Sequence, residues 1–146
     1  MANRRVCDIH SAARALAAEA ERLEALGLPT QACRLYRIAS EVEMAEIYEG
    51  GPVSLELTGI RILSATIFAW KGADQSRVLC LVKQGLDLGI PIHIGQMLSD
   101  IRDASLRGRA YFEGPPYDFS LSDVEFAIEK FLLCDINFPS AMDGAI

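Results

Sequence analysis

A spacing of small and apolar residues occurs twice in this chain, each time in a helical segment that follows a glycine turn. The two sets are Ala32, Tyr36, Ala39 and Val78, Val82, Gly85. Steps of four and three place each set on one face of a helix, and small residues at such positions let a neighbouring helix approach closely. The pattern therefore predicts an antiparallel helix pair that is present twice. Repeated helix pairs are typical of solenoid proteins.

The composition fits one folded and mostly helical domain. The 146 residues are too few for two ordinary domains joined by a linker. A hydrophobic content of 51% with only 23% charged residues argues against disorder. We therefore expect a single all-α domain over residues 1–139, followed by a frayed tail over 140–146.

The first helix pair is predicted over residues 5–48. Its first helix carries an inward stripe with alternating steps of three and four: Val6, Ile9, Ala13, Leu16, Ala20 and Leu23. Gly27 stands where a helix C-terminus often needs a left-handed residue, and Pro29 fits the first turn of the second helix. A turn this short makes the two helices antiparallel. We predict that Ala20 and Ala39 are buried where these helices cross.

The second helix pair is predicted over residues 52–88. Its first helix, over 53–70, has little polar surface, so we expect it to be buried on most sides. A strand over 60–68 is the alternative, but the length and the absence of alternation favour a helix. Asp74 is the predicted N-cap of the second helix, which ends near Leu88.

Two more helices are predicted beyond these pairs, which makes about six in total. A fifth helix covers residues 92–106. Ser122 and Glu125 form a capping box that opens a last helix over 120–134, and we expect this helix to cap the stack. Its apolar stripe is predicted to lie beside Trp70, either within one chain or exchanged between two copies, in which case the protein is a homodimer.

Small residues at a helix crossing with an aromatic residue between them resemble the tetratricopeptide-repeat family. The resemblance covers about residues 5–88 and is carried by Leu16, Ala20, Leu23, Gly27, Ala32, Tyr36 and Ala39, with Ala65 and Phe68 in the second pair. It implies a stack of helix pairs whose concave face, lined by the first helix of each pair, receives a peptide or a helix. In this chain that face would hold Arg14, Ala17, Glu21, Glu24, Ile62, Thr66 and Trp70. The alternative for Ile62 and Trp70 is burial in the core.

The sequence contains no pattern that indicates catalysis. It has no glycine-rich phosphate loop, no nucleophile elbow and no metalloprotease helix motif. Cys7 and His10 stand three residues apart, but no second close pair completes the four ligands of a structural zinc site. We expect no enzyme activity, no cofactor, no metal and reduced cysteines.

The net charge of −6 disfavours nucleic acid and anionic membranes as partners. No apolar run is long enough to cross a membrane, and the first residues lack the apolar segment of a signal peptide, so we expect a cytoplasmic protein. An acidic run over 41–49 is interpreted as a solvated face or as a docking patch for a basic partner.

These observations favour a protein–protein interaction module that binds a peptide or a helix. The alternative is a small acidic inhibitor or immunity-type protein that masks a basic toxin or enzyme, for which the negative charge is the relevant feature. Salt dependence separates the two, because the association rate of an acidic inhibitor falls steeply as ionic strength rises.

Overall fold

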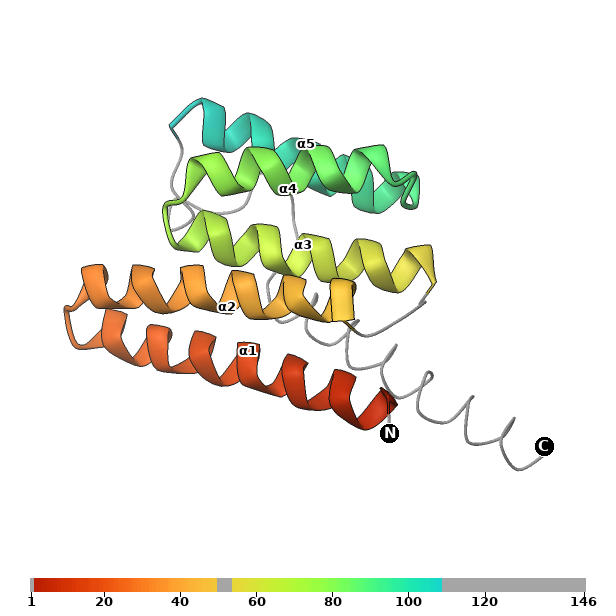
Figure 1. Ribbon diagram of the computed structural model, residues 1–146. Coiled ribbons are helices and arrows are strands. Elements are labelled where there is room, and N and C mark those ends of the chain that lie inside the picture. The colour runs from red at the N-terminus through yellow and green to blue at the C-terminus, as the bar shows by residue number, and fades with distance from the viewer. Residues whose placement is uncertain (1, 50–53, 109–146) are drawn as a thin grey trace.

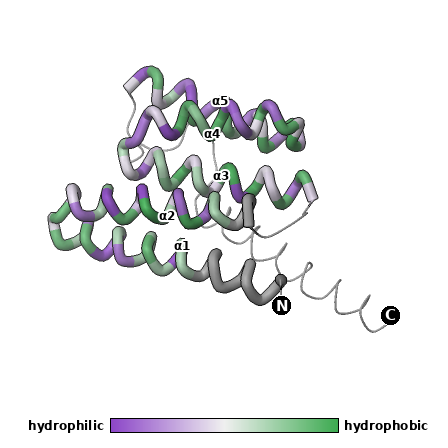
Figure 2. Tube along the Cα trace, in the orientation of Figure 1, coloured by the Kyte–Doolittle hydropathy of each residue, from purple (hydrophilic) through white to green (hydrophobic). Residues whose placement is uncertain are grey.

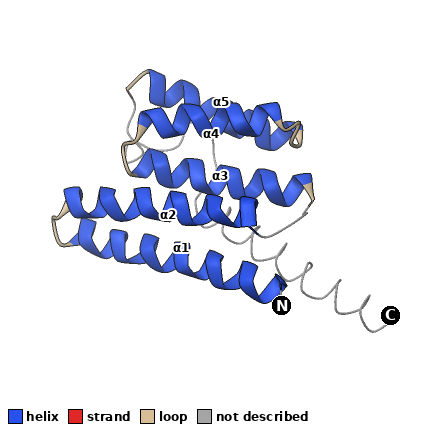
Figure 3. Cartoon of the chain, viewed as in Figure 1, coloured by secondary structure: helices blue, strands red, loops and turns tan. Residues whose placement is uncertain are grey.

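The computed structural model describes residues 2–49 and 54–108 of the chain. These residues form five α-helices: α1 (Ala2–Ala25), α2 (Pro29–Glu49), α3 (Leu55–Lys71), α4 (Gln75–Asp87) and α5 (Ile92–Leu106). The described part contains no strand, which confirms the all-α class (Figure 3). The helix predicted over 120–134 and the tail over 140–146 lie outside the described residues.

The helices lie side by side in one array, and each runs antiparallel to the next (Figure 1). Every helix packs on its neighbour in sequence, and α5 also packs on α3. The turns α1–α2 and α3–α4 and the C-terminal end of α5 therefore meet at one end of the array. Hydrophobic and hydrophilic residues alternate in short blocks along the helices, as expected where each buries one face (Figure 2).

The helix boundaries follow from local signals. Gly27 has a φ of 76° and ends α1, and Pro29 then begins α2. The Ser54 hydroxyl caps α3 by accepting a hydrogen bond from the Leu57 amide at 3.1 Å. Asp74 caps α4 in the same way, with its carboxylate 3.3 Å from the Arg77 amide, so the predicted N-cap is confirmed.

The crossing of α1 and α2 is built from small residues. Ala20 and Ala39 are both fully buried, as predicted. Ala13, Ala17 and Ala32 are buried with them. A seam of alanine lets two helix backbones approach closely, so the pattern in the sequence determines how tightly this pair packs.

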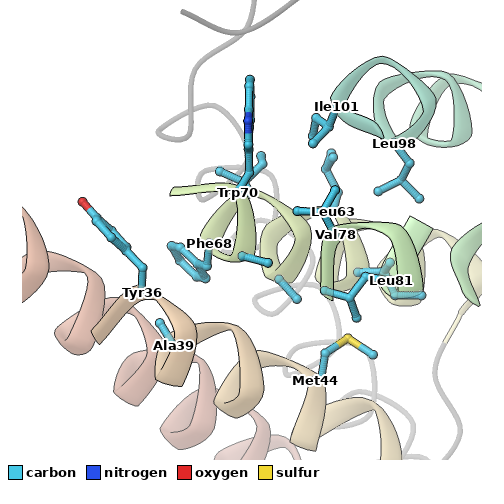
Figure 4. Close-up of a cluster of buried hydrophobic side chains, with 14 of the residues drawn as sticks. Tyr36, Ala39, Met44, Leu63, Phe68, Trp70, Val78, Leu81, Leu98 and Ile101 are labelled. Atoms are coloured by element: carbon cyan, nitrogen blue, oxygen red, sulfur yellow. The ribbon is translucent and has the colours of Figure 1, made fainter. Parts of the chain in front are cut away.

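The middle helix, α3, is buried on all sides. Every residue from Leu57 to Trp70 is buried, and the segment is helical throughout, which excludes the strand alternative. Phe68 points from α3 toward Tyr36 of α2, whereas Leu63 lies near Ile101 of α5 (Figure 4). The central position of α3 explains why its sequence has so little polar surface.

Two charged residues lie inside this core and correct one interpretation of the sequence. Arg61 of α3 and Glu43 of α2 form an ion pair at 3.2 Å, and both side chains are fully buried. Reading the acidic run over 41–49 as one solvated face or docking patch is therefore wrong for Glu43, although Glu41 is exposed. The physical reason is helical spacing, because Glu43 lies four residues after Ala39 and continues the inward stripe of α2.

Candidate functional site

A cavity of about 380 Å³ opens at the end of the array where the two turns and the end of α5 meet. This volume lies at the lower end of the range for small-molecule pockets, which is roughly 300–1,000 Å³. Residues of all five helices and of the adjoining turns line it: Glu24, Pro29, Ala32, Cys33, Tyr36, Trp70, Lys71, Ala73, Asp74, Gln75, Val78, Ser105 and Gly108. A site at this place can exist only when the whole array is assembled.

One wall of the cavity joins α1, α2 and α3 through Tyr36. The Tyr36 hydroxyl donates a hydrogen bond to Glu24 Oε1 at 2.5 Å. The Lys71 Nζ atom lies 4.7 Å from the centre of the Tyr36 ring and 3.7 Å from Glu21 Oε1. Only 10% of the Lys71 side chain is exposed. A cation over an aromatic face is stabilised by the ring quadrupole, so Lys71 fixes the position of this ring.

The end of α3 is held by side chains of α2. Arg37 donates hydrogen bonds from Nε to the Gly72 carbonyl at 2.8 Å and from Nη2 to the Ala73 carbonyl at 3.3 Å. The Cys33 thiol lies 3.8 Å from the Lys71 carbonyl and donates to it. The last carbonyl groups of a helix have no partner within the helix, so these bonds satisfy groups that would otherwise need water.

The end of α5 is held in the same manner by α4. Gln75 Nε2 donates a hydrogen bond to the Ser105 carbonyl at 2.7 Å. Gln75 and Ser105 both line the cavity. The walls are therefore fixed by bonds between neighbouring helices, and the cavity is preformed.

The electrostatic surroundings of the cavity are negative. Hydrogen bonds from Arg22 lower the pKa of Glu19 and balance the charge of that carboxylate. Glu21 and Glu24 remain on α1, and Asp74 lines the opposite side. The C-terminal ends of α1, α3 and α5 meet the N-terminal ends of α2 and α4 at this end of the array, so their opposite partial charges largely offset one another and the carboxylates set the sign.

Two of the residues predicted for partner binding line this cavity. They are Glu24 and Trp70. Glu21 lies at its edge, because its carboxylate faces Lys71, and 61% of the Glu21 side chain is exposed. Trp70 is 5% exposed, so its ring forms part of the wall.

The other predicted residues lie elsewhere. Arg14 is exposed on α1, whereas Ala17, Ile62 and Thr66 are buried. The Thr66 hydroxyl donates to the Ile62 carbonyl of its own helix at 2.6 Å. A Cβ atom added to Gly85 of α4 would lie 3.2 Å from Ile62, so Ile62 packs against α4. The structure therefore brings to the cavity only those predicted residues that lie near the C-terminal ends of α1 and α3.

Sequence reasoning did not assign Cys33, Lys71 and Gln75 to a site, and it treated Tyr36 as a packing residue alone. The available signal was the position of these residues at the ends of predicted helices. In an antiparallel array, the turns of successive pairs lie at the same end, which brings such residues together.

The described residues contain no group of three or more histidine, cysteine, aspartate and glutamate side chains that could hold a metal ion. Cys33 and Cys80, the described cysteines whose side chains are placed, are free thiols. None of the helices in the described ranges combines the length and the apolar character needed to span a bilayer.

Comparison of the chain with protein-family models, with curated proteins and with solved structures finds no match. The resemblance to the tetratricopeptide-repeat family therefore stays a prediction.

Proposed function

We propose that this chain is a protein-interaction module that binds a peptide or a helix of another protein. In this proposal the helix pairs stack as a short solenoid similar to tetratricopeptide repeats, with about six helices and a capping helix over 120–134. The observation that carries the proposal is the preformed cavity, to which all five described helices contribute. We further propose that the module is cytoplasmic and has no enzymatic activity.

The state of the polar groups around the cavity supports binding rather than catalysis. Glu24 accepts from Tyr36, Asp74 caps α4 and Gln75 holds the end of α5. A nucleophile or general base needs a partner that activates it within hydrogen-bond reach of the reacting group. Glu24 and Gln75 instead join neighbouring helices and Asp74 caps its own helix, which suits a rigid binding surface.

The distribution of charge bears on the alternative of an acidic inhibitor. Residues 109–146 contain seven of the twenty acidic residues and two of the fourteen basic ones. The rest of the chain is thus close to neutral overall. An acidic inhibitor of a basic protein would rely mainly on residues 109–146, whereas a peptide-binding module would rely on the cavity.

Affinity capture with two matched variants tests the proposal. Cys33→Phe places a ring in the cavity, and Cys80→Phe makes the same change at an exposed position of α4. We expect a protein from the source cell to be retained by the wild type and by Cys80→Phe, and lost with Cys33→Phe. Equal retention by all three would refute a cavity-based module. Retention that is equal at low salt and lost at high salt would favour the acidic inhibitor.

A further inference from the structure

We propose that the cavity takes one apolar side chain from a basic peptide segment of the partner. This inference rests on the proposed function and specifies the chemistry of what is bound. It comes from a contrast between the inner wall of the cavity and its edge.

The inner wall is apolar and rigid. Ala32, Tyr36 and Val78 line it, and each of them is at most 1% exposed. Trp70 completes the wall from α3. The polar groups among the lining residues already have partners within the protein, as the bonds of Glu24 and Gln75 show. A neutral apolar side chain loses no hydrogen bonds on entering such a space, whereas a charged one loses its hydration.

The edge of the cavity favours positive charge. Glu24 and Asp74 line it, and Glu21 adds a third carboxylate at its margin. The one cation among the lining residues, Lys71, lies within ion-pair distance of Glu21. Residues that flank the apolar side chain outside the cavity should therefore be lysine or arginine.

Charge also distinguishes two candidate occupants of this cavity, namely residues 109–146 of the same chain and a segment of another protein. The chain's own residues 109–146 are strongly acidic, with seven acidic and two basic residues. Like charges at an interface reduce both association and affinity. A basic segment of another protein is thus the better match for an edge that carries Glu21, Glu24 and Asp74.

The test uses the full-length protein and an array of short synthetic peptides. Each peptide has a central leucine, phenylalanine or tryptophan with lysine and arginine on both sides. One matched set has alanine at the centre, and a second has glutamate at the flanks. We expect the alanine set to bind about tenfold more weakly or worse, because the buried apolar surface is lost. We expect the glutamate set to bind least at low salt.

Variants assign each preference to its part of the site. Cys33→Phe should abolish the preference for a central apolar residue, and Cys80→Phe should leave it unchanged. Glu21→Lys should weaken the preference for basic flanks. The control is Glu56, an exposed carboxylate at the N-terminal end of α3, and Glu56→Lys should leave that preference unchanged. Cys33→Leu replaces Cys33→Phe if thermal unfolding shows that the larger side chain prevents folding.

Four results would overturn the proposal. The first is equal or tighter binding of the glutamate set, and the second is an apolar preference that survives in Cys33→Phe or in Cys33→Leu. The third uses Trp70, the single tryptophan of the chain. Nuclear Overhauser contacts from its ring to residues 109–146 that persist at saturating peptide would show that the chain fills its own cavity. If no peptide binds but capture still depends on Cys33, the chemistry proposed here is wrong and the proposed function stands.

Discussion

The buried ion pair between Arg61 and Glu43 offers the sharpest test of how this core is held together. Only one nitrogen of the Arg61 guanidinium, Nη1, reaches Glu43, while Nε and Nη2 are buried without a hydrogen-bond partner. Replacing Glu43 with leucine therefore leaves a buried cation with no counter-ion. Removing one partner of a buried pair costs about 3–5 kcal/mol. Most of that cost comes from the charge that remains.

This magnitude is large relative to the whole stability of a domain. Proteins of this size have a free energy of unfolding of about 5–15 kcal/mol, so Glu43→Leu should remove about a fifth of it or more. At about 3–4 °C for each kcal/mol, the melting temperature should fall by roughly 10–20 °C. Arg61→Met should also lower the free energy of unfolding, because it removes the cation that lies 3.2 Å from the fully buried Glu43 carboxylate.

The double variant distinguishes this reasoning from a simple loss of contact. With both residues replaced by apolar side chains, neither charge of this pair remains in the core. Glu43→Leu/Arg61→Met should therefore be within about 2 kcal/mol of the wild type or more stable. Urea unfolding of the four proteins, followed by circular dichroism and by Trp70 fluorescence, gives the coupling energy. Asp87→Ala removes the partner of the exposed Lys83 at 2.9 Å and serves as the control, with little expected change. Additive losses in the double variant would refute the argument.

Four further substitutions test backbone and packing features, each by urea unfolding. Gly85→Ala should lower the free energy of unfolding by about 1–3 kcal/mol, because its Cβ would lie 2.6 Å from Leu98 Cδ1. Gly95→Ala should instead leave the free energy of unfolding unchanged or raise it by up to about 1 kcal/mol, because its Cβ would meet only the end of the exposed Leu86 side chain. A loss equal to that at Gly85 would contradict this expectation. Ala73→Gly should raise the free energy of unfolding by about 0.5–1 kcal/mol, because Ala73 has a φ of 56°, a conformation that a β-carbon disfavours. A less stable variant would argue against strain at this turn. Ala39→Leu should lose about 1–3 kcal/mol through overpacking at the α1–α2 crossing, and a melting temperature equal to that of the wild type would show that the crossing is not tight.

The sequence predicted those features that depend on residues close together in the chain. The part of the α1 stripe from Ala13 to Leu23, the end of that helix at Gly27 and the cap at Asp74 are local, and each matches the structure, whereas the side chains of Val6 and Ile9 lie outside the described ones. Periodicity also predicted the burial of Ala20 and Ala39, because small residues on the inward face of a helix let a neighbouring helix approach closely.

Features that join separate helices were not predictable in this way. Ile62 shares a helix face with other residues, but periodicity does not say which neighbour covers that face, and α4 covers it here. Glu43 was interpreted as part of an acidic run, and Arg61 was assigned no role. Their positions within apolar stripes were a signal that a buried partner exists. The cavity depends on how far each of the five helices extends at this end of the array, and the geometry of the turns determines that.

The central position of α3 has a consequence for how the fold opens in solution. Among the described helices, α3 packs against α2, α4 and α5, whereas α1 packs mainly against α2. A helix with one main neighbour can open at a lower free energy than a helix that packs on three, so α1 can detach while the centre persists. Backbone amides in α3 should therefore exchange with deuterium only upon global unfolding. Amides in α1 should exchange sooner, through opening of that helix alone, giving an exchange gradient that runs outward from the middle of the array.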